Sequence, residues 1–545
     1  MEGHQHRMGR RRIGRAGVVA VSLIAALGGL AGAAAAGPAT GSQNSAAACS
    51  AAAIAGTLSL AGVTVVSASM DTSGSFTPPG SPAPITGLPA FCAVALTQAD
   101  SAGNLMNMAV WLPATWNGRF EGVGGGGYSC GISYPAVAAG VEGGYASAST
   151  DCGVPPADGL TGSWALNADN TLNLPLIDDF AFNGIHDMSV AGKAVTAGYY
   201  AHAPAYSYFD GCSTGGREGL MEAQRYPADY NGIVSGAPAI NWTKFIPAEI
   251  WPELVMKQSN DFLPTCKEQA FTEAVVKACG DQAGVTSPFI ADPARCHWDP
   301  MNLVGFSTPC GTITATDARV MAQIWAGPTR PDGEKLWYGL EPGASLGGLA
   351  GTVTASGVTV PTPFPITVSW LGSWLQQNPS WNWQTLTFAQ FDQLFAQSVS
   401  EFSSTIATDN PDLSQFKNDG GKILIWHGLA DQLIFPQGTI NYYQRVQEAM
   451  GGARRTDSFA RLFLAPGAQH CASAAGPAPA DPLTAIVNWV ENGQAPRSIL
   501  GTVVDPATNV VTLSRPLCAF PLAARYTGHG STTDAANFTC ARQPD

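Results

Sequence analysis

The stretch Gly211-Cys212-Ser213-Thr214-Gly215-Gly216 is the part of the sequence that indicates the fold most directly. It follows a short apolar run, residues 205–209, that predicts a strand, and it precedes a helix-like segment, residues 217–225. A serine between two glycines in a strand–turn–helix setting is typical of a nucleophile elbow, where the backbone is strained and only small neighbours fit. We therefore expect Ser213 to be a nucleophile exposed on an α/β core.

The same alternation of strands and helices continues on both sides of this turn. Expected strands lie at 106–112, 120–123, 145–147, 206–209, 422–426 and 461–464, and expected helices lie at 185–200, 436–450 and 482–491. This βαβ pattern predicts a mostly parallel sheet. The pattern is lost between the early segments, which end near residue 240, and the late ones, which begin near residue 416. This intervening stretch holds nine of the 14 tryptophans. We therefore expect an α/β-hydrolase core in two parts, residues 37–240 and 416–545, with a large inserted lid domain at 241–415.

The three-position pattern around Ser213 occurs a second time, in Gly127-Tyr128-Ser129-Cys130-Gly131. The first residue of this copy is the last of four consecutive glycines that begin at Gly124, directly after the expected strand 120–123. Glycine runs suit backbone donors, and an early Gly-rich loop together with the residue after the nucleophile commonly forms an oxyanion hole. We expect Gly127 and Thr214 to supply these amides, with Gly126 as the alternative to Gly127, and Ser129 to be an ordinary loop serine.

A base and an orienting acid should follow the nucleophile in the order Asp, His on this fold. Asp431 lies just beyond the expected strand 422–426, and His470 lies just beyond the strand 461–464. An imidazole can deprotonate a serine near neutral pH when a buried carboxylate fixes its tautomer. Asp431 and His470 are therefore the expected acid and base, whereas His427 and His186 are interpreted as structural histidines.

The placement of two cysteines supports this choice. Cys212 immediately precedes the expected nucleophile, and Cys471 immediately follows the expected base. A bridge between them would tether the two catalytic groups, and the alternative is that each cysteine pairs elsewhere.

The composition and the N-terminal segment indicate the location of the protein and exclude some classes of partner. Residues 1–36 contain five arginines, an apolar run and then small residues, which predicts a signal peptide rather than a permanent anchor and hence a secreted protein. All 12 cysteines follow this segment, and an even number of cysteines in an exported chain favours disulfides over metal thiolates. The formal net charge of −13, without any later basic block, argues against nucleic acid and membrane partners.

Taken together, these motifs resemble the tannase and feruloyl esterase family, which includes mono(2-hydroxyethyl) terephthalate hydrolase. The resemblance covers nearly all of residues 49–540, and its specific parts are the stretches 211–242 and 412–431 and the Cys-Ser, Asp and His-Cys constellation. It implies an α/β-hydrolase core with an inserted lid, a triad of Ser213, His470 and Asp431, and a bond between Cys212 and Cys471.

The resemblance also implies particular disulfides and a change at a metal site. It implies the bonds Cys49–Cys92, Cys279–Cys296 and Cys518–Cys540; number and position only suggest Cys130–Cys152 and Cys266–Cys310. The family's lid usually holds calcium through aspartates after the cysteine that matches Cys279. Here the matching positions are Gly280, Ala283 and Ser287, with Val285 and Phe289 at the backbone-donor positions, and Asp281 and Asp292 fall out of register. Because calcium needs six to eight oxygen ligands, we expect no calcium at this place. No other metal and no cofactor is expected.

The expected function is that of a secreted serine carboxylesterase acting on small esters of hydroxycinnamic or hydroxybenzoic acids, like a feruloyl esterase. Within the enzyme class, the alternatives are a tannase, which cleaves galloyl esters, and a terephthalate monoester hydrolase. From another class, a non-catalytic binding protein on a hydrolase scaffold would be indicated by a broken triad, yet all three positions are filled. For any single lid tryptophan, packing in the core is favoured over a role in holding an aromatic ring.

Overall fold

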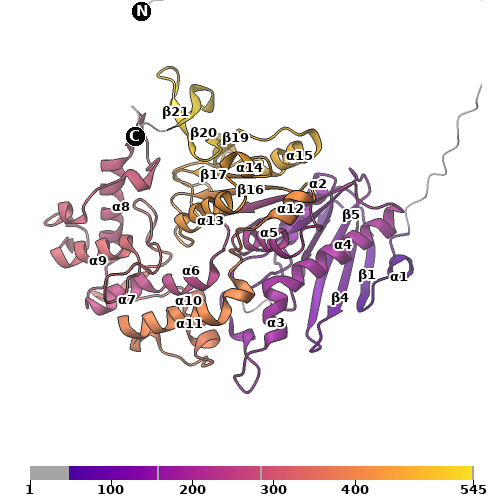
Figure 1. Cartoon of the computed structure of the whole chain (residues 1–545), viewed down its shortest axis with the longest axis horizontal. Coiled ribbons are helices and arrows are strands. Elements are labelled where there is room, and N and C mark those ends of the chain that lie inside the picture. The colour runs from indigo at the N-terminus through magenta and orange to yellow at the C-terminus, as the bar shows by residue number, and fades with distance from the viewer. Residues whose placement is uncertain (1–47, 156–158, 283–284, 543–545) are drawn as a thin grey trace, which may run out of the picture. The chain divides into compact units, whose positions relative to one another are not determined.

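A nine-stranded mixed sheet organises the chain (Figure 1). The structure is a computed structural model that describes residues 48–155, 159–282 and 285–542, and these described residues belong to one compact unit. The expected signal peptide, residues 1–36, lies outside the described residues.

The strand order of this sheet shows where the parallel prediction holds. In spatial order the strands are β1 (Val63–Asp71), β4 (Phe91–Ala99), β5 (Leu105–Pro113), β7 (Ala146–Thr150), β6 (Arg119–Val123), β8 (Tyr206–Cys212), β9 (Gly232–Gly236), β16 (Lys422–Gly428) and β17 (Ala460–Ala465). The pairings from β7 to β17 are all parallel, as predicted, whereas β1, β4, β5 and β7 pair antiparallel. The sheet is therefore mixed and mostly parallel.

Helices cover both faces of the sheet because successive side chains of a strand point to opposite sides. In β16, Ile423 and Ile425 belong to the larger hydrophobic core, whereas Leu424 and Trp426 belong to a second core on the other face. The helices α4 (Gly184–Tyr200), α5 (Thr214–Arg225) and α13 (Pro436–Ala449) pack against the sheet, as do α2 (Tyr134–Glu142) and α15 (Pro482–Asn492). The α15 residues Ile486 and Trp489 lie in the second core, so α15 covers that face.

A long insertion separates β9 from β16, which are neighbours in the sheet although residues 237–421 lie between them. Its main helices are α6 (Trp242–Ala248), α7 (Trp251–Gln258), α8 (Thr265–Cys279), α9 (Ala315–Ala326), α10 (Pro365–Ser369), α11 (Phe388–Ile406) and α12 (Ser414–Asn418). Three two-stranded hairpins accompany them: β10–β11 (Asp281–Gln282, Val285–Thr286), β12–β13 (Ser307–Thr308, Gly311–Thr312) and β14–β15 (Thr352–Ala355, Val358–Pro361).

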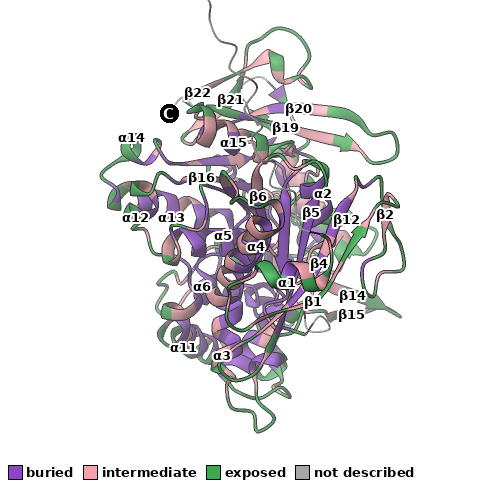
Figure 2. Cartoon of the chain, turned by 90° about the vertical axis from the view of Figure 1, so that its right-hand side faces the viewer, coloured by how far each residue is buried: buried purple, intermediate pink, exposed green. Residues whose placement is uncertain are grey.

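Small elements complete the fold at both ends of the described chain. Near the N-terminus these are α1 (Ala51–Thr57), β2 (Ser75–Phe76) and β3 (Ile85–Thr86), and α3 (Leu174–Asp178) precedes α4. After α14 (Ala453–Thr456) and β17, a three-stranded sheet of β18 (Ala478–Pro479), β19 (Ser498–Asp505) and β20 (Val510–Cys518) follows, then the hairpin β21–β22 (Leu522–Tyr526, Phe538–Arg542). The outer strands β19 and β20 carry exposed residues, whereas the central strands are buried (Figure 2).

Disulfides join segments across the whole described chain. All 12 cysteines are paired, as Cys49–Cys92, Cys130–Cys152, Cys212–Cys471, Cys266–Cys310, Cys279–Cys296 and Cys518–Cys540. These pairs include both the bonds that the resemblance implies and the two suggested by position. Among the described residues, no helix has the length and apolar character needed to cross a membrane.

Candidate active site

Ser213 occupies a strained turn at the carboxyl end of β8. β8 ends at Cys212 and α5 begins at Thr214, so one residue makes the whole change from strand to helix. Ser213 has φ +63° and ψ −125°, an unusual conformation for a non-glycine residue, and its N–H donates to Gly236 O at 3.0 Å. A side chain at Gly211 would place its Cβ 2.5 Å from the backbone carbon of Gly215, so the turn requires glycine there.

The Gly-rich loop before this turn has one amide left over for a ligand. Backbone or side-chain acceptors take the N–H groups on both sides of Gly127: Gly126 donates to Ser129 O and Tyr128 donates to Gly159 O. In the described chain no acceptor takes the N–H of Gly127, and the same is true of Thr214 at the first position of α5. These are the two amides that the sequence selects as candidate oxyanion donors, and Gly126, the alternative, is already engaged.

Two side chains of α5 fasten this loop to the turn. Thr214 is buried, and its hydroxyl donates to Gly127 O at 2.7 Å, so one candidate donor residue holds the other. One turn further along, the carboxylate of Glu218 accepts the N–H of Gly125 at 3.0 Å. Neither side chain's role could be predicted from the sequence, because only the fold brings the loop onto the helix.

Asp431 and His470 meet at the carboxyl ends of β16 and β17. Asp431 Oδ2 lies 2.8 Å from His470 Nδ1, and Asp431 Oδ1 accepts the N–H groups of Leu433 and Ile434, each at 2.9 Å. Asp431 is completely buried, and the His470 side chain retains 12% of its exposure. The carboxylate is fixed by the backbone and in turn holds the imidazole by Nδ1, which leaves Nε2 for chemistry.

A second imidazole also binds this carboxylate. His427 is fully buried, and its Nε2 lies 3.1 Å from Asp431 Oδ2 and 3.2 Å from the carbonyl of Ile434. Both neighbours are acceptors, so Nε2 carries the proton, and Nδ1 accepts from the hydroxyl of Thr439 at 2.8 Å. His427, predicted to be a structural histidine, therefore binds the candidate acid directly. Its position four residues before Asp431 is the only signal of this contact in the sequence.

The local electrostatics keep the negative charge on Asp431. Burial by itself would raise the pKa of Asp431, but the charge of His470 and hydrogen bonds from both imidazoles outweigh it and hold this pKa well below its usual range. Burial would lower the pKa of His470, yet the charge of Asp431 and the hydrogen bond to it raise the pKa above its usual value. Glu249, buried at the end of α6, has its pKa raised by burial and by the charge of Asp431, which favours its neutral form.

The disulfide Cys212–Cys471 brings the serine and the imidazole to one place. Its Cα atoms lie 5.9 Å apart although 259 residues separate them in sequence. Among the described residues Ser213 Oγ makes no hydrogen bond to His470, a contact that commonly tightens only when substrate binds.

The rival residues lie in different surroundings. Ser129 sits in a tight loop, paired with Gly126 through both backbone groups, and its neighbour Cys130 bonds to Cys152. His186 lies on α4, stacked on Tyr226 with ring centroids 3.8 Å apart and with Nδ1 2.6 Å from Asp229 Oδ2.

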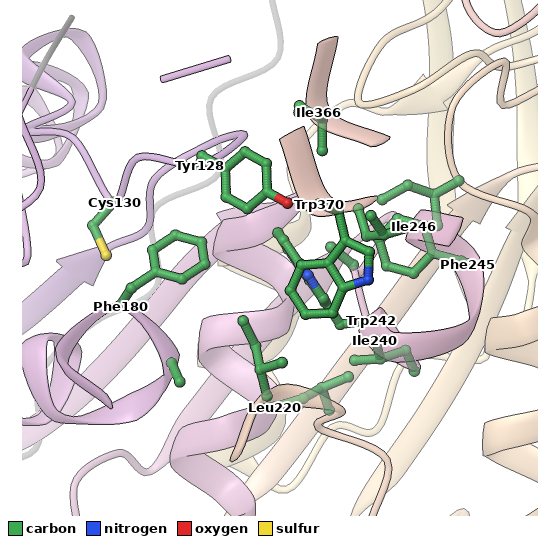
Figure 3. Close-up of a cluster of buried hydrophobic side chains, with 14 of the residues drawn as sticks. Tyr128, Cys130, Phe180, Leu220, Ile240, Trp242, Phe245, Ile246, Ile366 and Trp370 are labelled. Carbon is green, nitrogen blue, oxygen red and sulfur yellow. The ribbon is translucent and has the colours of Figure 1, made fainter. Parts of the chain in front are cut away.

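An aromatic cluster packs behind the Gly-rich loop (Figure 3). Tyr128 contacts Phe180 and Trp242 with ring centroids 6.1 and 5.7 Å apart, and Trp242 also contacts Trp370. Trp242, Trp370 and the neighbouring Trp374 are 0–1% exposed. These tryptophans of the insertion belong to the core, and they pack the insertion against the loop that carries Gly127.

The described residues do not fit a calcium ion after Cys279. Gly280 is followed by the small hairpin β10–β11, and no group of three ligand side chains occurs there within the described chain. The described residues contain one such group, His186, Glu222 and Asp229. There Lys193 Nζ already lies 2.9 Å from Asp229 Oδ1 and the imidazole binds the other oxygen, an arrangement of an internal hydrogen-bonded network rather than of a metal site.

Comparisons with known proteins show the family to which the chain belongs. The model of the family described as tannase and feruloyl esterase matches residues 92–541. A probable feruloyl esterase of Arthroderma benhamiae is 42% identical over 460 residues, which cover 83% of this chain and 86% of that protein. Probable feruloyl esterase B-1 of Aspergillus oryzae is 30% identical over 483 residues, covering 84% and 85%.

Solved structures show the same architecture over most of the chain. The crystal structure of feruloyl esterase B from Aspergillus oryzae aligns with a TM-score of 0.79 at 27% identity, covering 90% of this chain and 99% of that one. A tannin acyl hydrolase from Aspergillus niger aligns with a TM-score of 0.81 at 25% identity, covering 91% and 97%.

The sheet, the serine turn and these alignments define an α/β hydrolase with inserted elements. Within that class, the chain belongs to the tannase and feruloyl esterase family and is a carboxylic ester hydrolase like its members.

Proposed function

We propose that this protein is a secreted serine esterase that releases hydroxycinnamic acids from their esters through an acyl-enzyme. One observation carries the proposal: the pair Asp431–His470 is held beside the strained turn of Ser213 by the bond between Cys212 and Cys471. The relatives named as feruloyl esterases support the acyl group, and six disulfides suit an oxidising compartment.

In the proposed reaction, Ser213 Oγ attacks the ester carbonyl while His470 Nε2 accepts its proton. Asp431 keeps the proton of His470 on Nδ1 and stabilises the imidazolium that forms. The imidazolium then gives its proton to the leaving alcohol, and water repeats the sequence on the acyl-enzyme with His470 again as base.

The oxyanion of each tetrahedral intermediate is bound by the amides of Gly127 and Thr214. Both are free of other acceptors within the described chain, so they need no rearrangement when the charge develops. Each donor contributes about 3 kcal/mol of transition-state stabilisation, by the measured cost of removing one in another hydrolase.

We also propose a signal peptide and a domain organisation for this chain. Residues 1–36 act as the signal peptide, residues 37–240 and 416–545 form the core, and residues 241–415 form the lid. The sheet supports the division, because β9 and β16 are adjacent strands and the chain between them consists mainly of helices.

A tannase is the second candidate, because the tannin acyl hydrolase aligns as well as the feruloyl esterase does. A terephthalate monoesterase would need a cation for the free carboxylate of its substrate. Of the lid cations, Arg330 is engaged with Glu334 and Asp392. No observation therefore favours that third activity.

Two measurements test the proposal. A fluorophosphonate probe should label the wild-type chain and Ser129→Ala but not Ser213→Ala; labelling lost in Ser129→Ala and kept in Ser213→Ala would refute the assigned nucleophile. Specificity constants for methyl ferulate, methyl gallate and a terephthalate monoester then decide the acyl group. A clear preference for methyl gallate would replace the feruloyl esterase proposal by the tannase one.

A further inference from the structure

A cavity of about 530 Å³ lies in the C-terminal part of the fold, and none of the candidate triad residues lines it. It is bounded by β20, the hairpin β21–β22, the end of β17 and residues 285–294 of the insertion. Most of its wall is apolar, and the larger apolar residues include Phe289, Leu464, Leu517, Phe520 and Phe538. Its volume is that of a pocket for a small organic molecule. We call it the C-terminal pocket.

One buried cation lines this apolar wall. Arg515 is 8% exposed, and its guanidinium carbon lies 3.9 Å from the centroid of the Phe538 ring. Its Nη1 donates to Ser514 O at 3.1 Å, and no carboxylate of the described chain lies within ion-pair distance. Burial lowers the pKa of Arg515 to about 10, so the group remains charged at neutral pH. Within the part of the chain that the structure describes, this buried guanidinium stacks on an aromatic ring and has no carboxylate partner, a setting that favours an anionic ligand.

The surroundings of the pocket also favour an anion. Arg542 lines the C-terminal pocket and an adjoining cavity of about 840 Å³, which Arg525 also lines. The acidic side chains are Asp292 in the first cavity, which already has Arg295 as its neighbouring cation, and Asp281 in the second. A local excess of arginine stands out on a chain with a formal net charge of −13.

We propose that the C-terminal pocket binds a monocarboxylate with an apolar body, the carboxylate on Arg515 and the body against the apolar wall. The flat fork of a guanidinium matches a carboxylate with two parallel hydrogen bonds, and the wall supplies the hydrophobic contact. Two sources offer this chemistry. One is the aromatic acid that the proposed reaction releases, an assignment that rests on the proposed function; the other is an aliphatic acid from the surroundings.

Isothermal titration calorimetry with ferulate and with decanoate tests this site. The protein is the full chain carrying Ser213→Ala, so that no acyl-enzyme forms and binding is measured whether or not the proposed esterase activity is correct. Arg515→Met in this background removes the charge and keeps the length of the side chain. Arg454→Met is the matched control, because Arg454 is exposed and lines neither cavity.

At least one of the two acids should bind the parent with a dissociation constant below about 1 mM. Arg515→Met should raise this dissociation constant about tenfold to hundredfold, and Arg454→Met should leave it unchanged. Decanol, which lacks the carboxylate, should bind no better to the parent than to Arg515→Met. Binding of ferulate alone identifies the reaction's own acid as the ligand, and binding of decanoate alone identifies an aliphatic acid.

Ala523→Phe provides a second variant that leaves the arginine in place and fills the space, because Ala523 lines both cavities. It should abolish the same binding while circular dichroism and the melting temperature stay near those of the parent. The proposal is wrong if neither acid binds the parent, or if the binding survives in Ala523→Phe and in Arg515→Met, since the carboxylate would then lie elsewhere.

Discussion

The hydroxyl of Thr214 should contribute to the rate, although it touches neither the proton nor the attacking oxygen. It donates a hydrogen bond of 2.7 Å to the carbonyl oxygen of Gly127, whose own amide is one of the two proposed oxyanion donors. Thr214→Val removes this hydroxyl and keeps the shape and the β-branch of the side chain. The variant therefore frees the loop without changing the backbone preference at the start of α5.

The structure sets both limits of the expected effect. The smallest effect is the loss of one buried neutral hydrogen bond, about 1 kcal/mol. The largest is that of losing one oxyanion donor altogether, about 3 kcal/mol. Because a displaced amide still stabilises part of the charge, kcat should fall between about 5-fold and 150-fold. KM should change little, since the oxyanion forms only after the ester has bound.

Steady-state kinetics on methyl ferulate measure this effect, with the melting temperature recorded for each variant. Thr214→Ser is the matched control: it keeps the hydroxyl and should retain most of kcat. A valine variant with the kcat of wild type would refute the idea that the hydroxyl positions the loop. A serine variant as slow as the valine variant would assign the loss to packing of the methyl group instead.

Three further predictions concern the acid, its second imidazole and the bridge. Asp431→Asn should lower kcat about 10⁴-fold, by analogy with serine proteases. Asp431 raises the pKa of His470, which must be neutral to act as base, so the acid limb of the pH profile of kcat/KM should move to lower pH in this variant. An acid limb at the same pH as in wild type would contradict the assignment. His427→Phe removes one charged hydrogen bond from Asp431 and should lower kcat about tenfold or more with little change in KM, whereas an unchanged kcat would return His427 to a structural role. Replacing both Cys212 and Cys471 by serine opens a 259-residue loop, which should cost up to about 5 kcal/mol in the unfolding free energy and abolish most activity. Removal of the disulfide between β20 and β22 should lower the melting temperature but leave kcat unchanged, and equal losses from both bonds would contradict a positional role.

The sequence predicted the fold where the pattern of apolar residues is regular. The parallel strands β6, β8, β16 and β17 and the helices α4, α13 and α15 lie within a few residues of their expected positions. The strands β1 and β4 were not expected. β1 is half exposed and carries no continuous apolar run, whereas β4 begins with the apolar run 91–96, a signal that could have predicted it. β8 extends to Cys212 rather than ending at Phe209, since pairing with β9 continues to the turn.

The candidate site was predicted in part. Sequence order and local context indicated Ser213, Asp431 and His470, and two adjacent cysteines linked the first to the last. The roles of His427 and of the Thr214 hydroxyl could not be predicted in this way. Both act through a partner on another segment, and hydrogen bonds between segments leave no periodicity in the sequence.

By itself, the sequence determined the elements of the core, the residue types of the candidate triad and the Gly-rich loop, because these depend on local backbone geometry and on the order of the strands. Only the tertiary structure decided which amides have no acceptor among the described residues, which second imidazole holds the carboxylate, and that Arg515 lies buried beside an apolar cavity with no carboxylate partner in that part of the chain. The physical reason is that burial and hydrogen-bond partners belong to pairs of distant segments, and their positions are fixed only when the whole chain packs.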